Sequence, residues 1–297
     1  MDEIVEDLLG TNNKSTDSRG QNNSYKKPYN KNNNWKEQNQ KRNEAYKKID
    51  NMSLKISKDG NMFTQYLNIL SRFEKYSVGN CMLILEAEPN AIQIKEKQDW
   101  IDRGYEITQP EKSMTILEPN KVNGKIYYNP KEEYDISRTN SPIPEETEYT
   151  DRDLLLALFK DCKAEREVVD VLPNGEKGAE YVESENKLYM CRGLKSDYLL
   201  KTIIQEFARM EMQDIENSEM KEFKTYCISY MICKKYGLET SQFDFSNLPN
   251  ELANKEKGKD IRVELDDIRK NFITVNSKIA DYFEQEEKSR KNKEKER

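Results

Sequence analysis

Residues 201–210, Lys-Thr-Ile-Ile-Gln-Glu-Phe-Ala-Arg-Met (KTIIQEFARM), decide how the second half of the chain is interpreted. With the two leucines just before this stretch, its apolar residues recur at the helical period, and Ser196 stands where an N-cap is expected. The pattern therefore predicts an amphipathic helix. Because residues three and four apart share a helical face, Gln205, Glu206 and Arg209 are expected to lie close together on its polar side.

The composition limits the chemistry that is available to the chain. Of its 297 residues, 35% are hydrophobic and 35% are charged, which leaves room for two modest cores and for segments that do not fold. No histidine is present, so the commonest general base near neutral pH and the commonest zinc ligand are both missing. The cysteines are widely spread without a Cys-x-x-Cys pair, which indicates neither a disulfide framework nor a thiolate zinc site. Catalysis would have to rest on carboxylates, Lys, Tyr or Cys.

Charge and hydropathy indicate which partners and which cellular location to expect. The formal net charge of −6 argues against a protein that binds nucleic acid over its whole surface, although a local basic patch can still bind phosphate. No apolar run approaches the length of a membrane span, and the N-terminal MDEIVEDLLG is acidic where a secretory signal is basic. We therefore expect a cytoplasmic protein with no membrane partner.

The first segment, residues 1–50, is predicted to be a disordered arm. Between residues 11 and 50 the chain carries ten Lys and Arg against four Asp and Glu and is crowded with Asn. Such a composition cannot bury enough apolar surface to offset the chain entropy. The cations alternate with Tyr25, Tyr29 and Trp35, so the arm either contacts nucleic acid through phosphates and stacking or only solubilises the chain.

Four further segments follow from the patterning. Residues 51–136 read as two helices, a strand with a short helix, and a hairpin closed by the Asn-Gly dipeptide at 123–124. Residues 137–150, rich in Pro, Thr and Glu, are the expected linker. Residues 151–250 combine helices with a pair of short strands, and residues 251–297 form a charged helical tail. The tail is expected to present one apolar stripe, made of Ile261, Val263, Leu265, Ile268, Phe272, Val275, Ile279 and Tyr282.

The block QYLNILSRFEKYSVGNCMLILEAEPNAIQIKEKQDWIDRGYEI, with SMTILEP after it, resembles the N-terminal domain of ArdC-type antirestriction proteins. The family pattern is a helix ending in Tyr-Ser-x-x-Asn, an apolar helix, a Pro with Ala shortly after, and a Trp helix ending in Gly-Arg. The resemblance covers about a third of the chain and implies a single-stranded DNA-binding domain. The family's Gly-Arg is Gly104-Tyr105 here, which removes a cation. The positions that match the pattern are Tyr76, Ser77, Asn80, Leu83, Ile84, Pro89, Ala91, Trp100 and Gly104.

The candidates for a nucleic-acid-binding face combine local cations with polar and aromatic side chains. Trp100 also reads as a core anchor, because large aromatics inside helices usually bury. Ser77 and Asn80 also read as residues that close a turn. The full set is Arg72, Lys75, Tyr76, Ser77, Asn80, Trp100, Arg103, Tyr105 and Lys112.

The second block resembles the zincin-like metallopeptidase domain of the same family. DISRT, EYVESENKLYM, LLKTIIQEFARME and YCISYMICKKYGLETS occur in the family's order. A zincin helix carries His-Glu-x-x-His, whose two imidazoles bind zinc beside a general-base Glu. When the chain is matched to that pattern, Gln205 occupies the position of the first His and Arg209 that of the second. Glu206 keeps the general-base Glu, and the acidic ligand of the next helix falls near Tyr226. The resemblance thus implies a degenerate site with no metal, no cofactor and no catalysis.

Two alternatives to a degenerate zincin remain at this stage. A metal site rebuilt from other ligands would have to use Glu206, Glu211 and the thiol of Cys191 or Cys227. The stretch 201–210 also reads as a core helix unrelated to zincins. For the degenerate site, we expect Arg209 to form an ion pair with Glu206 at the i, i+3 spacing.

The predicted fold is α+β: an ArdC-like single-stranded DNA-binding domain followed by a zincin-like domain, flanked by the arm and the tail. The predicted function is a non-catalytic, single-stranded DNA-binding accessory or anti-defence protein of a plasmid or phage, with a pseudopeptidase domain as scaffold. The alternative is an interaction module or inhibitor that binds a host or mobile-element protein without DNA. A working metallopeptidase with non-histidine ligands is a third possibility.

Overall fold

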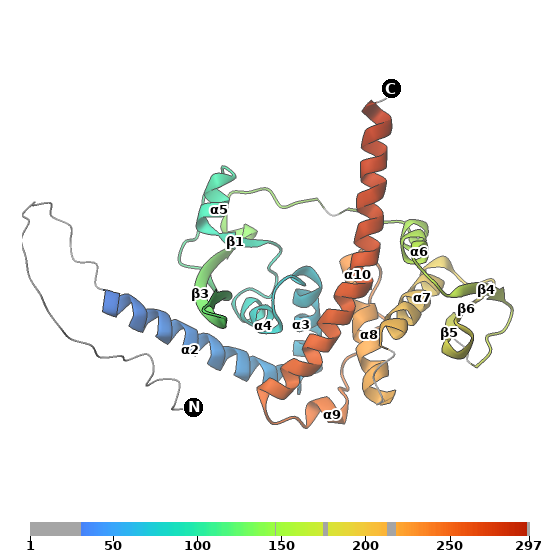
Figure 1. Cartoon of the computed structure of the whole chain (residues 1–297), viewed down its shortest axis with the longest axis horizontal. Helices are drawn as coiled ribbons and strands as arrows, with labels where there is room; N and C mark the ends of the chain where they lie inside the picture. The colour runs from blue at the N-terminus through green and yellow to red at the C-terminus, as the bar shows by residue number, and fades with distance from the viewer. Residues whose placement is uncertain (1–30, 146, 175–177, 213–217, 296–297) are drawn as a thin grey trace, which may run out of the picture. The chain divides into compact units, whose positions relative to one another are not determined.

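The computed structural model describes residues 31–145, 147–174, 178–212 and 218–295 (Figure 1). The fold mixes helices with two small sheets. Residues 38–297 cluster as one compact unit, so the two expected domains share a core. Among the described residues, no helix combines the length and the apolar character needed to cross a bilayer.

The expected disordered arm is wrong for residues 31–50, which belong to helix α2 (Lys31–Ile56). Four apolar residues on one face of α2 are buried in the core: Ala45, Ile49, Met52 and Ile56. Their helical spacing crosses the predicted boundary at residue 50, where the surrounding Asn and Lys residues obscure it. Residues 1–30, with Tyr25 and Tyr29, lie outside the described part of the chain.

Helices α3 (Gly60–Arg72) and α4 (Val78–Ala87) follow as predicted, with the turn between them slightly earlier. Asp59 caps α3 by accepting hydrogen bonds from the backbone N–H groups of Asn61 and Met62. Ser77 caps α4 through the N–H of Asn80.

The first sheet has three antiparallel strands in the order β1-β3-β2: β1 (Ile94–Glu96), β2 (Met114–Val122) and β3 (Lys125–Asp135). The short helix α5 (Lys97–Asp102) follows β1. The predicted Asn-Gly turn is confirmed, since Asn123 and Gly124 both have positive φ, at 50° and 79°. A 3-10 turn, η1 (Ile136–Arg138), follows β3.

The second sheet lies between helices α6 (Asp151–Lys160) and α7 (Ser196–Glu211) in the chain. Its order is β4-β6-β5, where β4 (Glu165–Val169) runs parallel to β6 (Lys187–Cys191) and β5 (Ala179–Val182) runs antiparallel to it. The 3-10 turn η2 (Glu183–Glu185) connects β5 to β6.

The predicted start of α7 is wrong by one residue, because Lys195 is the N-cap. The hydroxyl of Ser196 instead donates a hydrogen bond to the carboxylate of Asp151, at 2.7 Å, and so joins α7 to α6. Helix α8 (Ser218–Lys235) follows, and then α9 (Asn250–Ala253).

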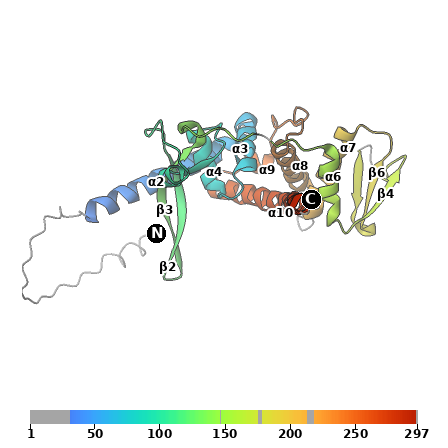
Figure 2. The ribbon, with the colours of Figure 1, turned by 90° about the horizontal axis from the view of Figure 1, so that it is seen from above.

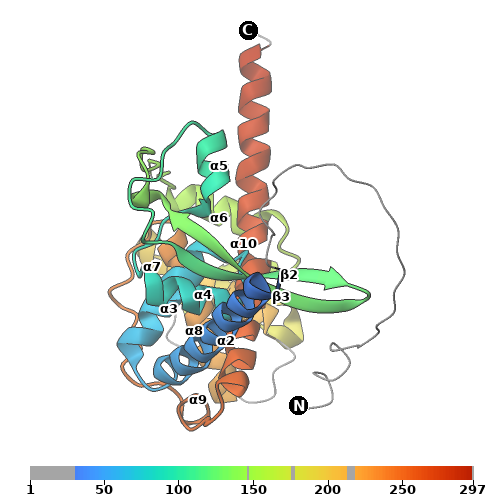
Figure 3. The same ribbon diagram turned by 90° about the vertical axis from the view of Figure 1, so that its left-hand side faces the viewer.

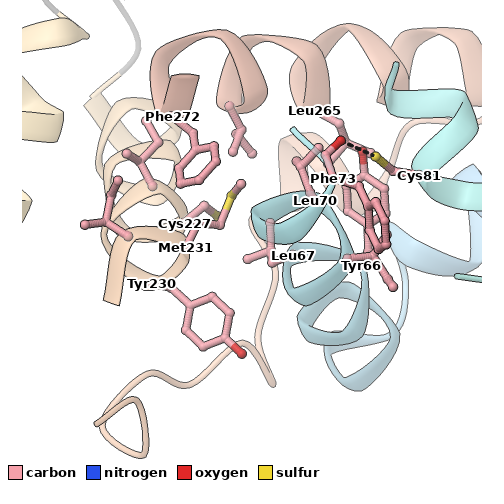
Figure 4. Close-up of a cluster of buried hydrophobic side chains, with 14 of the residues drawn as sticks. Tyr66, Leu67, Leu70, Phe73, Cys81, Cys227, Tyr230, Met231, Leu265 and Phe272 are labelled. Carbon is pink, nitrogen blue, oxygen red and sulfur yellow. Dashed lines mark hydrogen bonds between the residues drawn. The ribbon is translucent and has the colours of Figure 1, made fainter. Parts of the chain in front are cut away.

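The predicted tail is the long helix α10 (Gly258–Lys295), and its first part belongs to the core. It packs against α4, α6, α7 and α8. Leu265 and Phe272 enter the cluster formed by α3, α4 and α8 (Figure 4). Most of the predicted stripe is buried, but Val263 is 54% exposed because it lies off the buried face.

Candidate functional site

The central contact of the second block is the predicted ion pair between Glu206 and Arg209 on α7. The Nε atom of Arg209 lies 3.2 Å from Oε2 of Glu206, whose side chain is only 2% exposed. The same guanidinium also donates through Nη1 and Nη2 to the carboxylate of Glu222 on α8, with 2.7 Å for Nη2. Arg209 therefore joins two carboxylates from consecutive helices, which is the forked geometry that suits arginine.

Glu206 also contacts the second sheet. Its Oε2 accepts a hydrogen bond from the backbone N–H of Tyr181, at 3.1 Å. Tyr181 lies on β5, an edge strand of the sheet, and this N–H points to Glu206 instead of to β6. The carboxylate thus satisfies a backbone donor that a bound extended peptide would otherwise use.

Tyr226 holds the segment that follows α8. Its hydroxyl accepts a hydrogen bond from the N–H of Asp244, at 2.8 Å, and donates to the carbonyl of Gln242, at 3.3 Å. Its ring packs against Phe243 and Phe245. Burial raises the pKa of Tyr226, so the phenol stays protonated near neutral pH, whereas metal binding needs the phenolate.

The alternative metal ligands are directed to other partners. Glu211 forms an ion pair with Lys278 of α10. Cys227 is buried in the core, where desolvation raises the pKa of its thiol, and the thiol of Cys191 contacts the carbonyl of Asp170 at 3.5 Å. Within the described residues, no group of three or more Cys, Asp and Glu side chains gathers as a metal site. Gln205 is half-buried and forms no side-chain hydrogen bond there.

Several of the nucleic-acid-binding candidates have structural roles instead. Trp100 is 1% exposed and donates from Nε1 to the carbonyl of Tyr134, so it is the core anchor. The side chain of Asn80 is buried and makes two hydrogen bonds to the backbone of Leu117, from its Nδ2 to the carbonyl and from the N–H to its Oδ1. Because β2 is an edge strand there, Asn80 acts as a substitute for a neighbouring strand.

The remaining polar candidates near α3 and α5 are also engaged. Tyr76 donates its hydroxyl proton to Glu133, at 2.9 Å, and Ser77 is the cap already described. Arg72 donates to the carbonyl of Pro89. Tyr105 is half-buried and packs edge-on against the Trp100 ring, at a centroid distance of 6.2 Å. These four side chains give the N-terminal block its geometry.

Three candidates remain as free cations: Lys75, Arg103 and Lys112 are exposed and form no ion pair with any described residue. They lie in different loops, after α3, after α5 and before β2. Lys112 lines a cavity of about 200 Å³ with Arg138, Glu88 and Asp135 among its other walls. Of the nine predicted side chains, these three are exposed cations without an ion pair in the described part of the chain.

The sequence-based list also missed a surface, the distal half of the β2–β3 hairpin. Ile126, Tyr127 and Tyr128 are 60%, 39% and 40% exposed. Two lysines, Lys121 and Lys125, stand beside them on the same hairpin. The sequence KVNGKIYYN contains the signal, because Lys and Tyr occur on both faces of the predicted strand pair.

Comparisons with known proteins give low-identity similarities. No protein-family model matches the chain. The chain is 24% identical, over 298 aligned residues, to the uncharacterized protein pXO2-81 of Bacillus anthracis; the match covers 77% of this chain and 50% of that protein. The metal-free crystal structure of the antirestriction protein ArdC from the R388 plasmid has a TM-score of 0.46 and 13% identity, and the match covers 69% of this chain and 85% of that one. The Mn(II)-bound structure of the same protein has a TM-score of 0.46 and 12% identity, with the same coverage. The chain is thus similar to ArdC at low identity, and it spans about half the length of the curated relative it matches.

Proposed function

We propose that this chain is a non-catalytic accessory protein of a mobile genetic element, which binds single-stranded DNA and uses a pseudopeptidase domain as scaffold. The observation that carries the proposal is the contact set of Glu206. The carboxylate of Glu206, at the position of the family's general base, accepts a hydrogen bond from the backbone N–H of Tyr181 and pairs with the guanidinium of Arg209. A permanent cation at the place of the second zinc ligand repels a dication, and Glu206 serves as a structural anion.

The DNA-binding part rests on the resemblance of the first block and on the free cations Lys75, Arg103 and Lys112. Cations supply most of the sequence-independent affinity for a phosphate backbone. The anti-defence part rests on the same resemblance, which implies an antirestriction activity in a cell that receives a plasmid or phage.

Metal content tests the pseudopeptidase part. After incubation with zinc and desalting, we expect elemental analysis to find no stoichiometric metal on the purified protein. The matched control is the variant that restores the ligand types, Gln205→His with Arg209→His and Tyr226→Glu, which is expected to retain zinc if the scaffold has zincin geometry. One tightly bound metal per wild-type chain would contradict the proposal.

Oligonucleotide binding tests the DNA part. Gel shifts with single-stranded oligonucleotides are expected to show binding at low salt that weakens steadily as salt rises. No binding at low salt, or binding that does not depend on salt, would contradict the proposed DNA binding. An unchanged transfer frequency into restricting recipient cells, with and without the protein, removes the antirestriction part.

A second candidate function, docking of a host or mobile-element protein, is favoured by the outer strand of the second sheet. β4 is an edge strand that is exposed along most of its length, and Val168 on it is 53% exposed. Val171, just after the strand, is 80% exposed. Exposed apolar edges pair with added strands. A stoichiometric protein partner recovered without nucleic acid would support this function over the first.

A further inference from the structure

The distal half of the β2–β3 hairpin stands free of the sheet that anchors it (Figure 2). β1 pairs with Glu133–Asp135, so within the described residues the ribbon from Glu118 to Asn129 consists of two strands with no third strand beside it. Residues Lys125–Asn129 are exposed on both faces. Because a two-stranded ribbon with solvent on both sides is marginally stable, large apolar side chains there indicate a binding surface.

The register distributes these side chains evenly over the ribbon. Tyr128 lies opposite Pro119 and Lys121 opposite Ile126, and both pairs share one face. Tyr127 and Lys125 lie on the other face. Each face of the ribbon therefore carries one tyrosine and one lysine.

Helix α2 adds to the face of Tyr128, since it passes beside the base of the hairpin (Figure 3). Lys41 of α2 forms an ion pair with Glu132 on that face, at 3.5 Å. Five residues further along α2, Tyr46 is 41% exposed. Burial and, to a smaller extent, the Tyr128 hydroxyl raise the pKa of Tyr46, and Arg42 opposes the shift.

The charge of the ribbon is of one sign. Pro119 to Pro130 contain two lysines and no Asp or Glu, in a chain whose formal net charge is −6. The carboxylates that flank this stretch form ion pairs: Glu118 with Lys131, at 3.1 Å, a lysine that also pairs with Glu96, and Glu132 with Lys41. The tip is thus a local cationic and aromatic surface on an acidic protein.

This combination fits unpaired nucleobases joined by phosphates. A tyrosine ring stacks on any exposed base, and adjacent lysines attract the backbone without reading sequence. A duplex hides its base faces, which leaves the tyrosines without a stacking partner. We propose that the ribbon surface, defined as Tyr46, Lys121, Lys125, Tyr127 and Tyr128, is where this protein binds single-stranded nucleic acid. The inference rests on the proposed function and assigns its DNA binding to a surface other than the predicted face.

Fluorescence anisotropy with a labelled oligothymidylate tests the assignment on the full chain. Tyr127→Leu with Tyr128→Leu keeps apolar strand residues but removes the stacking rings, and it is expected to weaken binding by at least about tenfold. Lys121→Gln with Lys125→Gln is expected to reduce the slope of log affinity against log salt by about 1.4. The matched control is Tyr198→Ala, which removes a tyrosine that is 48% exposed on α7 and is expected to leave binding unchanged.

A second variant reports the contact directly. Tyr128→Trp keeps a stacking ring and is expected to bind as the wild type does, with additional fluorescence quenching by the oligonucleotide. No added quenching on binding overturns the assignment, and so does tighter binding of a duplex than of its single strand.

Different results would contradict the proposed function and the ribbon surface. If the wild type binds no oligonucleotide, the proposed function fails. A different result would overturn only the ribbon assignment. In that case the wild type and the ribbon variants bind equally well, and a combined Lys75→Gln, Arg103→Gln and Lys112→Gln variant loses binding. The predicted face would then be the binding site. Thermal unfolding of each variant verifies that the fold persists.

Discussion

Arg269 on α10 donates from its Nε atom to the backbone carbonyl of Tyr76, at 2.7 Å, and to that of Glu74, at 3.0 Å. The two carbonyls belong to the turn between α3 and α4, so one guanidinium from the C-terminal helix binds the first block of the chain. This contact ties the predicted helical tail to the fold of the first block.

Replacing Arg269 by Met is expected to lower the free energy of unfolding by about 2–3 kcal/mol, because the two carbonyls lose a charged donor. Urea denaturation measures the change. Lys270→Met is the matched control, since the ion pair that Lys270 forms in the described part of the chain is with Asp266 on its own helix, and its side chain is 64% exposed. Equal effects of the two substitutions would show that the Arg269 contact contributes nothing.

Arg209→Met removes the guanidinium whose Nε atom lies 3.2 Å from the buried carboxylate of Glu206. We expect a loss of about 3 kcal/mol, as for other half-broken buried pairs. Adding Glu206→Gln should recover much of the loss, because the amide oxygen still accepts from Tyr181 while the buried charge is gone. Calorimetric melting of the single and double variants measures the coupling, and a double variant less stable than Arg209→Met would refute it.

Asn80→Ala removes both hydrogen bonds to the backbone of Leu117 and leaves a buried N–H and carbonyl unpaired. The expected cost is about 2–3 kcal/mol of stability. Oligonucleotide affinity, measured below the melting temperature, should stay unchanged because the side chain is buried. If the Asn80→Ala protein folds but no longer binds the oligonucleotide, Asn80 contributes to the binding face after all.

Gly60→Ala is expected to disrupt the contact between α3 and the segment after α8. A Cβ atom on Gly60 would overlap the backbone oxygen of Phe245, which is not the end of a flexible side chain. Overpacking of this kind costs about 1–3 kcal/mol. The neighbouring Asn61→Ala, at an exposed position, should have little effect on the melting temperature, and a Gly60→Ala variant as stable as Asn61→Ala would contradict the close approach.

Glu133→Gln is expected to change the pH dependence of stability. Burial raises the pKa of Glu133 from its ordinary value of 4.5, although the Tyr76 hydroxyl and Lys131 oppose the shift. The folded protein therefore binds this proton more tightly than the unfolded chain, and the associated stability is lost as pH rises from 4.5 through the raised pKa.

The amide variant keeps an acceptor for Tyr76 and has no charge to bury. In urea denaturation at a series of pH values, Glu133→Gln should match the wild type in acid and become the more stable protein toward neutral pH. If the wild type gained stability over the variant as pH rose, the direction of the shift would be wrong.

Much of the local structure followed from the sequence. The helical periods of α7 and α10, the Asn-Gly turn and the pairing of Glu206 with Arg209 were all predicted, because each depends on residues within a few positions of one another. The burial of Trp100 also followed from its residue type. The prediction of disorder from composition was wrong at α2. There, four apolar residues in a stretch of Asn and Lys were enough to bury one helical face.

The tertiary structure decided which polar residues are available for binding. Asn80 and Tyr76 fit a family-like motif, but their partners, Leu117 and Glu133, lie in the sheet and enter only when the first block folds. The contact of Glu206 with Tyr181 and the projection of the hairpin likewise depend on how distant segments pack. The period and spacing of residues in the sequence predict the helix or strand to which a residue belongs. Its exposure depends on the elements that pack against that helix or strand. In this chain, the packing of α10 and the edges of the two small sheets determine which side chains are exposed.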